Sequence, residues 1–325
     1  MTPLPTPLPM LCHTCNSACK KYGRHRNGLQ RFRCNECGRT LTEDHDRLLG
    51  EMRLPLDRAL LCLQLLVEGN SVRSTERITD VGKREILKLL VLVGSRCEHM
   101  MERRIVNVKV KDVQLDEIWC FVQCKQKTKN RLNKGEGFGD YYCFVAIERY
   151  TKLVLAWHLG QRTAEDTEIF IEKVSRATAG EFQVSADGFE AYPEAISLSL
   201  GTRVSFAQLI KTYRAAHPQQ SPEGERRYSP SRVLEITKVT RIGDPDPAMI
   251  STSHIERQNL TMRMGMRRYT RLTNAFSKKV ENLKATLALH FAYYNFCRIH
   301  QTLRCTPAME AGIVKSIWEL KDLLR

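Results

Sequence analysis

The sequence predicts a multidomain α+β protein, and three observations lead to that prediction. Two CxxC pairs lie near the start of the chain, apolar residues recur at helical spacing over residues 54–93, and strand-like runs alternate with helix-like runs from residue 112 onward. These changes of pattern predict a four-cysteine zinc ribbon or finger (1–47), a three-helix helix-turn-helix (48–96), a basic linker (97–111) and an α/β domain with C-terminal helices (112–325).

The net charge of the chain is positive and is concentrated at its two ends. The sequence holds 51 Lys and Arg against 36 Asp and Glu, which gives a net charge of +15. Residues 1–111 and residues 251–325 each carry +8, whereas residues 112–250 carry −1. Two basic ends around a near-neutral middle favour a catalytic body held between two contacts with a polyanion. We therefore expect nucleic acid as the partner.

The sequence contains no recognisable targeting or membrane-spanning segment. The opening residues, MTPLPTPLPML, have prolines where a leader would have an apolar core, and they have no basic residues before it. No apolar run approaches the roughly 18 residues of a spanning helix. Twelve cysteines in such a chain favour a reducing compartment. These features predict a soluble cytoplasmic protein with no membrane partner.

Two CxxC pairs separated by eighteen residues have the spacing of a zinc ribbon: Cys12, Cys15, Cys34 and Cys37. Each pair presents two thiolates to one side of a tight turn, and two pairs complete a tetrahedron around Zn²⁺. The metal would stabilise a segment of about forty residues that is too short for a core of its own. Cys19 and His13 are nearby substitutes, but neither preserves two matched pairs.

The stretch between the two cysteine pairs is basic and carries Tyr22 and Phe32. Such a composition suits phosphate contact together with aromatic packing. A purely structural module and a redox-active set of cysteines remain the alternatives.

Residues 54–93 predict three helices. Apolar residues recur at three- and four-residue steps from Leu56 to Val67, and Ser71 then caps a shorter helix. A turn at residues 80–82 precedes the third helix. Three short helices with a glycine-containing turn before the last one favour a helix-turn-helix. The outward side chains of the third helix would contact DNA, unless they form an ordinary solvated face: Lys83, Arg84 and Lys88.

From residue 112 the sequence predicts three strands, a helix, and then a strand, a helix and a strand. The first helix begins at Thr163, with acidic residues in its first turn. This order resembles the ribonuclease H arrangement. The expected strands cover residues 113–123, 141–148, 153–159, 182–186 and a stretch near Val204.

Two aspartates lie where carboxylates from separate strands could meet. Asp116 lies within the first strand, VQLDEIWCFV, and Asp187 follows the buried run FQVSA directly before a glycine. Strand side chains alternate, so we expect Asp116 and Glu117 to point to opposite faces and only Asp116 to face a metal ion. The alternatives are an exposed strand acid and a turn-forming Asp-Gly pair.

Glu256 has both a local and a catalytic interpretation. Ser253 and Glu256 form the pattern of a capping box, in which the glutamate has a purely local function. On the same predicted helix, Asn259, Arg263 and Arg267 fall at three- and four-residue steps and would make one polar, basic face. A carboxylate on such a face opposes DNA binding unless a cation lies between it and phosphate. The residues alone leave both interpretations open.

Together these motifs resemble a known family. The blocks LDEIW, SADGFEAY and SHIERQNLTMRMGMRR look like the three acidic blocks of DDE transposases of the insertion-sequence-one family. A four-cysteine finger followed by a helix-turn-helix is similar to the same family, and YYNFCRIHQTLRCTPAMEAG resembles an ending common in transposases and integrases. The resemblance covers nearly the whole chain. It implies a ribonuclease H-like catalytic domain in which Asp116, Asp187 and Glu256 bind Mg²⁺ or Mn²⁺.

One segment departs from the compact members of that family. Sixty-eight residues separate Asp187 from Glu256, which predicts an inserted segment near residues 212–250. This segment holds three outside candidates for the third metal ligand: Glu235, Asp244 and Asp246.

The resemblance implies a DNA transposase of the prokaryotic nucleoid. Such an enzyme binds the ends of an insertion element in double-stranded DNA, cuts them to free 3′-hydroxyls, and joins these to target DNA by two-metal-ion phosphoryl transfer. Bringing two ends together requires a homodimer or a larger assembly. The oxygen ligands suit Mg²⁺, and the thiolates suit Zn²⁺. The expected phosphate contacts outside the helix-turn-helix are Arg257, Asn259, Arg263, Arg267, Arg298 and His300.

Two other functions fit the same sequence. A non-catalytic DNA-binding regulator or a domesticated transposase would keep the basic ends without needing the carboxylates. A nuclease of the same fold would cut DNA without joining it.

Overall fold

The computed structural model describes residues 10–12, 15–25, 28–43, 48–213, 233–270 and 273–325. Contacts divide the chain into two compact units, Met1–Arg53 and Leu54–Arg325. The boundary lies six residues beyond the predicted end of the cysteine module at residue 47. The predicted helix-turn-helix and the predicted catalytic domain belong to a single unit.

The first unit is a small antiparallel sheet. Its hairpin pairs Cys19 with Cys34, so the second CxxC pair directly follows the central strand. The guanidinium groups of Arg31 and Arg33 lie over the ring of Tyr22, at 5.3 and 5.4 Å from its centroid. The strands, in the order β1-β2-β3, are β1 (Cys19–Arg24), β2 (Gln30–Cys34) and β3 (Thr40–Thr42).

The second unit begins with the three predicted helices. The Ser71 hydroxyl caps the second helix by accepting from the Ser74 N–H at 3.0 Å, and Asp80 ends that helix in the left-handed conformation. These two features confirm the predicted cap at Ser71 and the predicted turn at residues 80–82. The helices are α1 (Leu56–Val67), α2 (Val72–Thr79) and α3 (Lys83–Arg104).

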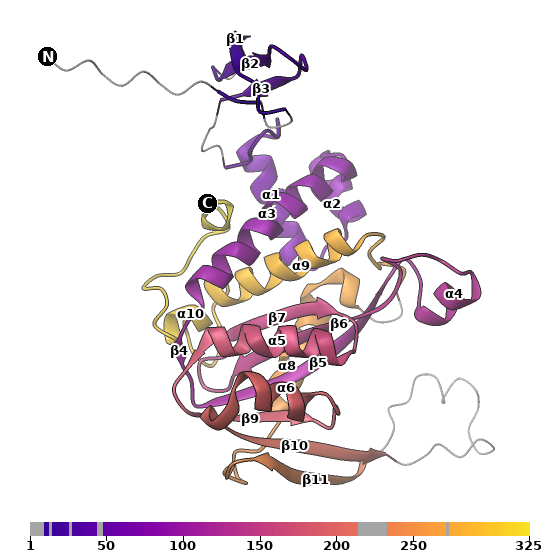
Figure 1. Cartoon of the computed structure of the whole chain (residues 1–325), viewed down its shortest axis with the longest axis vertical. Helices are drawn as coiled ribbons and strands as arrows, with labels where there is room; N and C mark the ends of the chain where they lie inside the picture. The colour runs from indigo at the N-terminus through magenta and orange to yellow at the C-terminus, as the bar shows by residue number, and fades with distance from the viewer. Residues whose placement is uncertain (1–9, 13–14, 26–27, 44–47, 214–232, 271–272) are drawn as a thin grey trace, which may run out of the picture. The chain divides into compact units, whose positions relative to one another are not determined.

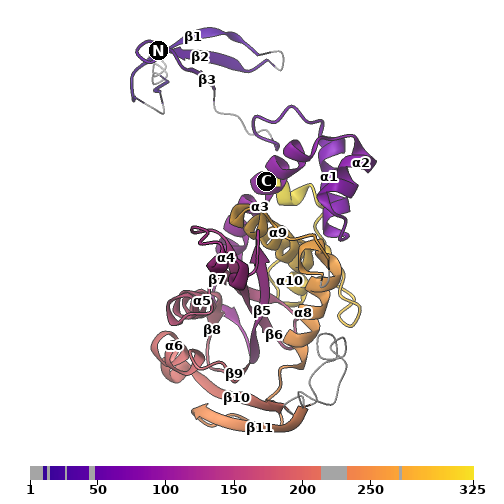
Figure 2. The same ribbon diagram turned by 90° about the vertical axis from the view of Figure 1, so that its right-hand side faces the viewer.

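The third helix is longer than the sequence indicated. Residues 97–104 of the expected linker form its last two turns, because Cys97 and Met101 extend its buried stripe by four-residue steps. Helix α3 packs along helix α9 (Val280–Ala292), as Figures 1 and 2 show. At their crossing, a Cβ on Gly94 would lie 2.5 Å from the Cα of Ala285, so this close approach requires glycine.

A six-stranded mixed sheet forms the centre of the second unit, in the order β11-β10-β9-β5-β6-β7 (Figure 1). Strand β5 pairs antiparallel with β6 and parallel with β9, so it joins the antiparallel half of the sheet to the parallel half. All five predicted strands are confirmed. The strands are β5 (Asp112–Val122), β6 (Gly139–Glu148), β7 (Val154–Gly160), β9 (Phe182–Asp187), β10 (Val204–Tyr213) and β11 (Val233–Ile242).

Helices cover both faces of this sheet (Figure 2). Helices α5 (Ala164–Ala177) and α6 (Tyr192–Ser199) lie on one face, and α8 (Ser253–Gly265) and α10 (Pro307–Glu310) lie on the other. The Thr163 hydroxyl caps α5 as predicted. A 3-10 turn (Gly201–Arg203) precedes β10, short α4 (Gln126–Arg131) joins β5 to β6, and β4 (Val108–Lys109) pairs with β8 (Thr178–Ala179).

The C-terminal segment that contains YYNFCRIHQTLRCTPAMEAG has structural functions here. The fully buried Asn295 amide bonds both the N–H and the carbonyl of Val154 on edge strand β7, at 3.0 and 2.9 Å. Thr306 caps α10. The surrounding elements are 3-10 turns at Arg267–Tyr269 and Asp322–Leu324 and a π turn at Tyr293–Cys297.

The segment in which an insertion is predicted adds an outer strand to the sheet. Strand β11 pairs antiparallel with β10, and the expected Pro- and Ser-rich loop over residues 217–231 lies outside the described residues. Among the described helices, none has both the length and the hydropathy needed to cross a membrane.

Candidate active site

The four predicted cysteines come together in the first unit. The sulfurs of Cys12 and Cys37 lie 3.6 Å apart and those of Cys15 and Cys34 lie 3.4 Å apart, without a disulfide. All four sulfurs lie within 4.8 Å of one another. Sulfurs around a tetrahedral Zn²⁺ would lie about 3.8 Å apart, given Zn–S bonds of about 2.3 Å. The cluster therefore fits a zinc ion.

The turns of the two CxxC pairs hold the thiols in place. The N–H of Glu36 points at the Cys34 sulfur at 3.4 Å, and Gly38 provides the left-handed residue that closes this turn. Cys19 is not part of the cluster, and its thiol bonds the Ser17 carbonyl at 3.7 Å. The other substitute, His13, lies outside the described residues.

Asp116 and Asp187 meet at the junction of the two halves of the sheet. The parallel pairing of β5 with β9 ends at Leu115 and Ala186, so each aspartate is the next residue on its strand. Their carboxylate oxygens lie within 4.8 Å of each other. Two acids that are seventy-one residues apart in the chain thus form one candidate metal site.

Glu117 joins this group, so the expectation that only one of Asp116 and Glu117 could approach a metal is wrong. A carboxylate oxygen of Glu117 lies within 4.8 Å of both aspartates. The alternation of strand side chains still holds for the other contacts of these residues, because Glu117 bonds groups on the α5–α6 side and Asp116 bonds α8. Strand β9 ends beside them, which leaves both side chains room over its end.

The partners of Glu117 are already in place. Arg162 bonds one of its carboxylate oxygens at 2.8 Å, and the Tyr192 hydroxyl donates to the other at 3.0 Å. Arg162 in turn lies 4.3 Å from the centroid of the Phe189 ring. The charge of Glu117 is therefore offset by Arg162. The carboxylate of Asp116 instead accepts a hydrogen bond from the uncharged amide of Asn259.

The electrostatics of the group favour a bound cation. Burial, and then the negative charges of Asp187, Glu117 and Glu256, raise the pKa of Asp116 to about 7. Burial and the charge of Asp187 also raise the pKa of Glu117, although Arg162 opposes this rise. A divalent cation at this position would offset the repulsion among the carboxylates.

Glu256 lies on α8 near the two aspartates but outside the compact acidic group. Its carboxylate pairs with Lys211 of β10 and accepts from the Thr252 hydroxyl at 3.0 Å. The predicted capping box does not form, because Thr252 is the N-cap residue and the Ser253 N–H donates to Ser251. About half of the Glu256 side chain is exposed, so it faces solvent beside the aspartates.

Gln114 positions the helix that carries Glu256. Its side-chain oxygen accepts from the N–H groups of His254 and Ile255 at 2.9 and 3.1 Å, so a buried strand residue caps α8. One turn further along, the Asn259 amide donates to Asp116 at 2.6 Å. Gln114 and Asp116 share one face of β5 because they are two residues apart. The sequence pattern did not predict a function for Gln114, although a glutamine inside an apolar strand is an unusual residue that could have indicated one.

The turn after β9 fixes the direction of Asp187. One Asp187 carboxylate oxygen accepts from the Phe189 N–H at 3.2 Å, as a turn-forming aspartate does. The buried Gln208 amide bonds the backbone carbonyls of Asp187 and Phe189 at 3.0 and 2.9 Å, and Arg241 donates to Gln208 at 2.8 Å. The turn and the acidic group are therefore compatible.

The three outside candidates for a third metal ligand do not belong to the acidic group. Glu235 is exposed on β11, and the backbone of Asp244 bonds Ser205. The Asp246 carboxylate accepts from its own loop at Ala248. None of these three belongs to a metal-compatible group among the described residues.

Three predicted phosphate contacts gather beside α8. His300 lies among Arg257, Arg298 and Lys152; burial first, and then these three charges, lower its pKa. The Lys152 ammonium also lies 3.3 Å from the ring of His254. We call this set, which comprises Lys152, His254, Arg257, Arg298 and His300, the α8 cationic cluster.

The other predicted DNA contacts separate into different environments. Lys83, Arg84 and Arg267 line a cavity described below, and Lys88 pairs with Glu85. Helix α8 ends at Gly265, so Arg267 lies in the next turn and the predicted continuous basic face does not exist.

Two predicted DNA contacts remain on α8. Arg263 lies in its last turn and is partly buried. Asn259 is buried and its amide donates to Asp116, so it supports the acidic site and cannot face DNA.

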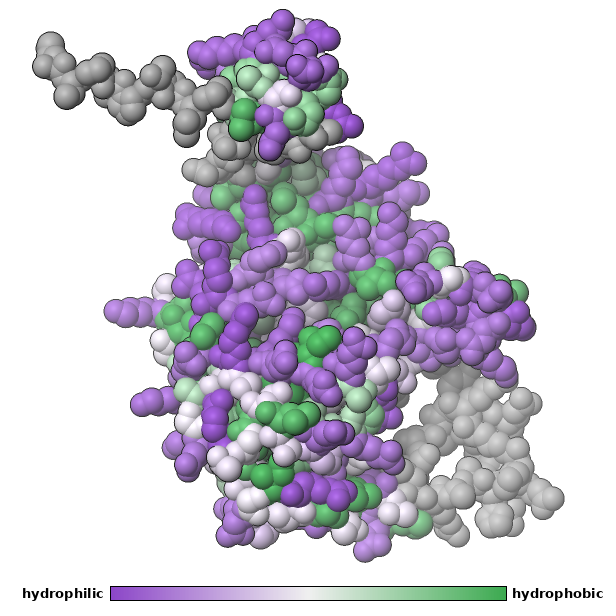
Figure 3. Space-filling view, viewed as in Figure 1, coloured by the Kyte–Doolittle hydropathy of each residue, from purple (hydrophilic) through white to green (hydrophobic). Residues whose placement is uncertain are grey.

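Figure 3 shows hydrophilic side chains gathered over α4 and over the α2–α3 region, and a mixed surface over α5 and α6.

No protein-family model matches this sequence, and a comparison with curated proteins finds no match either.

The cysteine geometry predicts one zinc ion per chain. Purified protein should contain about one equivalent of zinc by plasma mass spectrometry. Cys12→Ser should lower this content to near zero, because it removes one of the four thiolates. Cys19→Ser is the matched control and should keep the zinc; equal loss in both variants would contradict the assignment.

The contacts of Gln114 predict a local loss of stability. Gln114→Met should lower the free energy of unfolding by about 1–3 kcal/mol, because two N–H groups of α8 lose their acceptor. Hydrogen exchange at His254 and Ile255 should accelerate in this variant. Gln183→Met on β9 is the control, since its amide bonds the Asp246 loop and leaves α8 untouched. Unchanged exchange at the start of α8 in Gln114→Met would refute the capping function.

Proposed function

We propose that this protein is a DNA transposase that cuts element ends and transfers the freed 3′-hydroxyls to target DNA. The meeting of the Asp116 and Asp187 carboxylates at the sheet junction carries the proposal. Acids on separate strands can hold divalent metal between them, and such sites serve phosphoryl transfer. The resemblance of all three acidic blocks to DDE transposases supplies the substrate.

The topology supports a ribonuclease H-like catalytic domain. Three antiparallel strands are followed by helix, strand, helix and strand, and the later strands pair parallel on the other side of β5. This is the order that the sequence resemblance implied. The cysteine cluster is compatible with a zinc module, and we propose that this module and the helix-turn-helix bind DNA.

The residues present fit an oxygen-only metal site. Asp116, Asp187 and Glu256 would hold Mg²⁺ or Mn²⁺, with Glu117 as a further carboxylate of the same group. When bound, the metal would stabilise the attacking and leaving oxygens of an in-line displacement. Asn259 orients Asp116, and the turn held by Gln208 orients Asp187. Lys211 pairs with Glu256, so its charge would partly offset that of a carboxylate proposed to hold the metal.

The α8 cationic cluster would hold the phosphates on either side of the reacting one. Arg257 follows Glu256 on α8, and its positive charge lies close enough to His300 to lower the pKa of that imidazole. Arg298 and His300 reach the same region from the C-terminal segment. These groups would bind the DNA strand and orient it without taking part in the chemistry.

The Asp187→Asn substitution separates the enzyme from the regulator. Asparagine can keep the hydrogen bond to Phe189, so the fold and the DNA affinity should stay unchanged. Cleavage of labelled element-end DNA in Mg²⁺ should fall by about a hundredfold or more, because one metal ligand loses its charge. Both 3′-end cleavage and joined product are measured on sequencing gels.

The outcomes of this assay distinguish the three functions. Cleavage and joining by the wild type, both lost in Asp187→Asn, support the transposase. Cleavage without joined product identifies a nuclease. Specific DNA binding without cleavage in either Mg²⁺ or Mn²⁺ identifies a regulator.

A paired comparison identifies the third carboxylate ligand. Glu256→Gln should weaken Mn²⁺ binding by about tenfold and abolish cleavage, because Glu256 is exposed and its only described ion pair is with Lys211. Glu117→Gln should have a smaller effect, because Arg162 and Tyr192 already satisfy this carboxylate. Mn²⁺ binding is measured by calorimetry, with melting temperatures as the control for folding. The reverse order of effects would assign Glu117 as the third ligand.

A further inference from the structure

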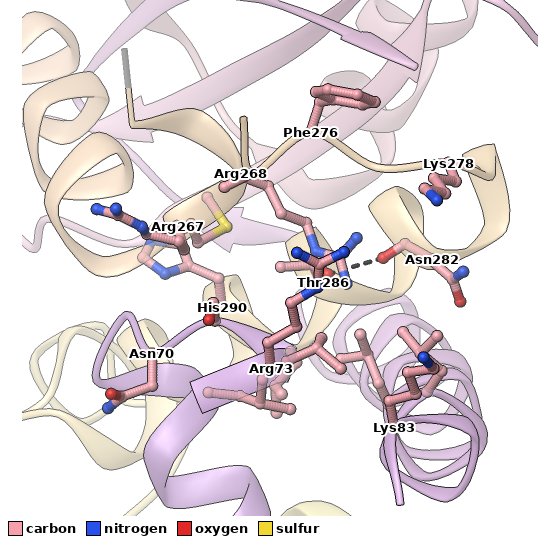
Figure 4. A pocket seen from close by; sticks show the side chains of 18 of the residues that line it. Asn70, Arg73, Lys83, Arg267, Arg268, Phe276, Lys278, Asn282, Thr286 and His290 are labelled. Atoms are coloured by element: carbon pink, nitrogen blue, oxygen red, sulfur yellow. Dashed lines mark hydrogen bonds between the residues drawn. The ribbon is translucent and has the colours of Figure 1, made fainter. Parts of the chain in front are cut away.

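A large cavity lies away from the acidic site, within the second unit. It has a volume of about 860 Å³, within the range of sites that bind small molecules and cofactors. Residues at the end of α1 and at the start of α2 and α3 form one wall, and residues within 265–268 and 273–290 form the other. Figure 4 shows Arg73 and Lys83 on the first wall and Arg267, Arg268 and Lys278 on the second.

The cavity collects positive charge, and no salt bridge to its cationic side chains is present in the described part of the chain. Six cationic side chains line it, and no aspartate or glutamate among the described residues does so. Like charges that converge from two walls repel one another unless an anion lies between them. The six cationic side chains that line the cavity are Arg73, Lys83, Arg84, Arg267, Arg268 and Lys278.

One buried polar group that lines the cavity lacks a hydrogen-bond partner, and one half-buried cation there has no carboxylate paired with it among the described residues. The Nε2 atom of the buried His290 has no hydrogen-bond partner in the described part of the chain. The Arg268 guanidinium donates to the Ser277 hydroxyl at 2.5 Å, and no salt bridge to it is found among the described residues. Burial lowers the pKa of Arg268 to about 10, so it stays cationic at neutral pH.

The same cavity also has apolar side chains, which come from both walls. Leu66, Leu87 and the buried Leu90 line the first wall, and the buried Leu289 lines the second. Phe276 adds an aromatic ring to the second wall, 5.2 Å from the ring of Phe121. A simple anion such as inorganic phosphate would contact the cations and leave these apolar side chains exposed. A ligand with an anionic group and a planar apolar body would use both.

We propose that the cavity binds one unpaired nucleotide, with its phosphate on the cationic side chains and its base against the apolar side chains, which include Phe276. The base must be unpaired because a base within a duplex is stacked and cannot enter a cavity. The nucleotide could be free or could belong to a single strand or an opened duplex end. The proposal does not depend on DNA cleavage, since none of its residues belongs to the acidic site.

The test measures DNA binding by the full-length protein without divalent metal. The probes are a fluorescein-labelled oligo-dT strand of about ten nucleotides and a duplex of equal length, followed by fluorescence anisotropy. Two matched pairs of exposed residues separate the cavity from general basic charge. Arg73→Gln is compared with Arg77→Gln on the same helix, and Lys278→Gln is compared with its neighbour Lys279→Gln.

The cavity variants should bind the single strand about tenfold more weakly, whereas their controls should bind as the wild type does. Phe276→Leu should also weaken single-strand binding by about tenfold, because it removes stacking while keeping an apolar side chain. Duplex affinity should be unaffected by Phe276→Leu. Melting temperatures show whether each variant is folded.

Competition with dTMP identifies the source of the nucleotide. Displacement of the labelled strand by dTMP supports a site for free nucleotides, and displacement only by unlabelled strand supports a site for DNA. The proposal is overturned if the cavity variants and their controls bind alike, or if Phe276→Leu leaves single-strand binding unchanged. These results would leave the cleavage assay unaffected, so each proposal can fail separately.

Discussion

The capping of α8 by Gln114 is the constraint on which the acidic site depends. One buried amide oxygen on β5 holds the first two free N–H groups of the helix, and the Asn259–Asp116 bond holds the same helix one turn later. Two attachments to one strand fix both the rotation and the axial position of α8. The position of Glu256 relative to Asp116 therefore follows from β5, which also carries Glu117 and borders Asp187. A single strand organises carboxylates from three segments of the chain.

This arrangement brings together negative charges that repel one another. Folding alone would favour fewer acids at this junction, because burial and mutual repulsion raise the pKa values of Asp116 and Glu117. The protein offsets part of this cost with Arg162 on one side and Lys211 on the other. In the described part of the chain, no salt bridge to Asp116 or Asp187 accompanies these two pairs. A group of charges that lowers the stability of the fold is typical of functional sites, and it fits a site that a metal ion would complete.

Local patterns predicted much of this fold, and long-range pairing explains what they missed. The strands and the caps at Ser71 and Thr163 depend on neighbouring residues, so the sequence was sufficient for them. The approach of Glu117 to the aspartates depends on where β9 ends beside β5, which no local pattern encodes. The same holds for Lys211, which pairs with Glu256 across forty-five residues. The basic face predicted for α8 failed for a local reason, because the helix stops at Gly265 before it reaches Arg267.

Helix α8 connects the two sites that we propose. Glu256 lies near its start and Gly265, at its end, lines the nucleotide cavity. At about 1.5 Å per residue, the nine-residue step between them spans about 14 Å along the helix axis. Stacked nucleotides of one strand are about 3.4 Å apart, so this length corresponds to about four nucleotides. If both sites bind the same strand, a nucleotide held in the cavity would fix which phosphate reaches the carboxylates. The attachment of α8 to β5 would then fix the distance between the two sites. This distance would determine how many nucleotides separate the cut from the unpaired base.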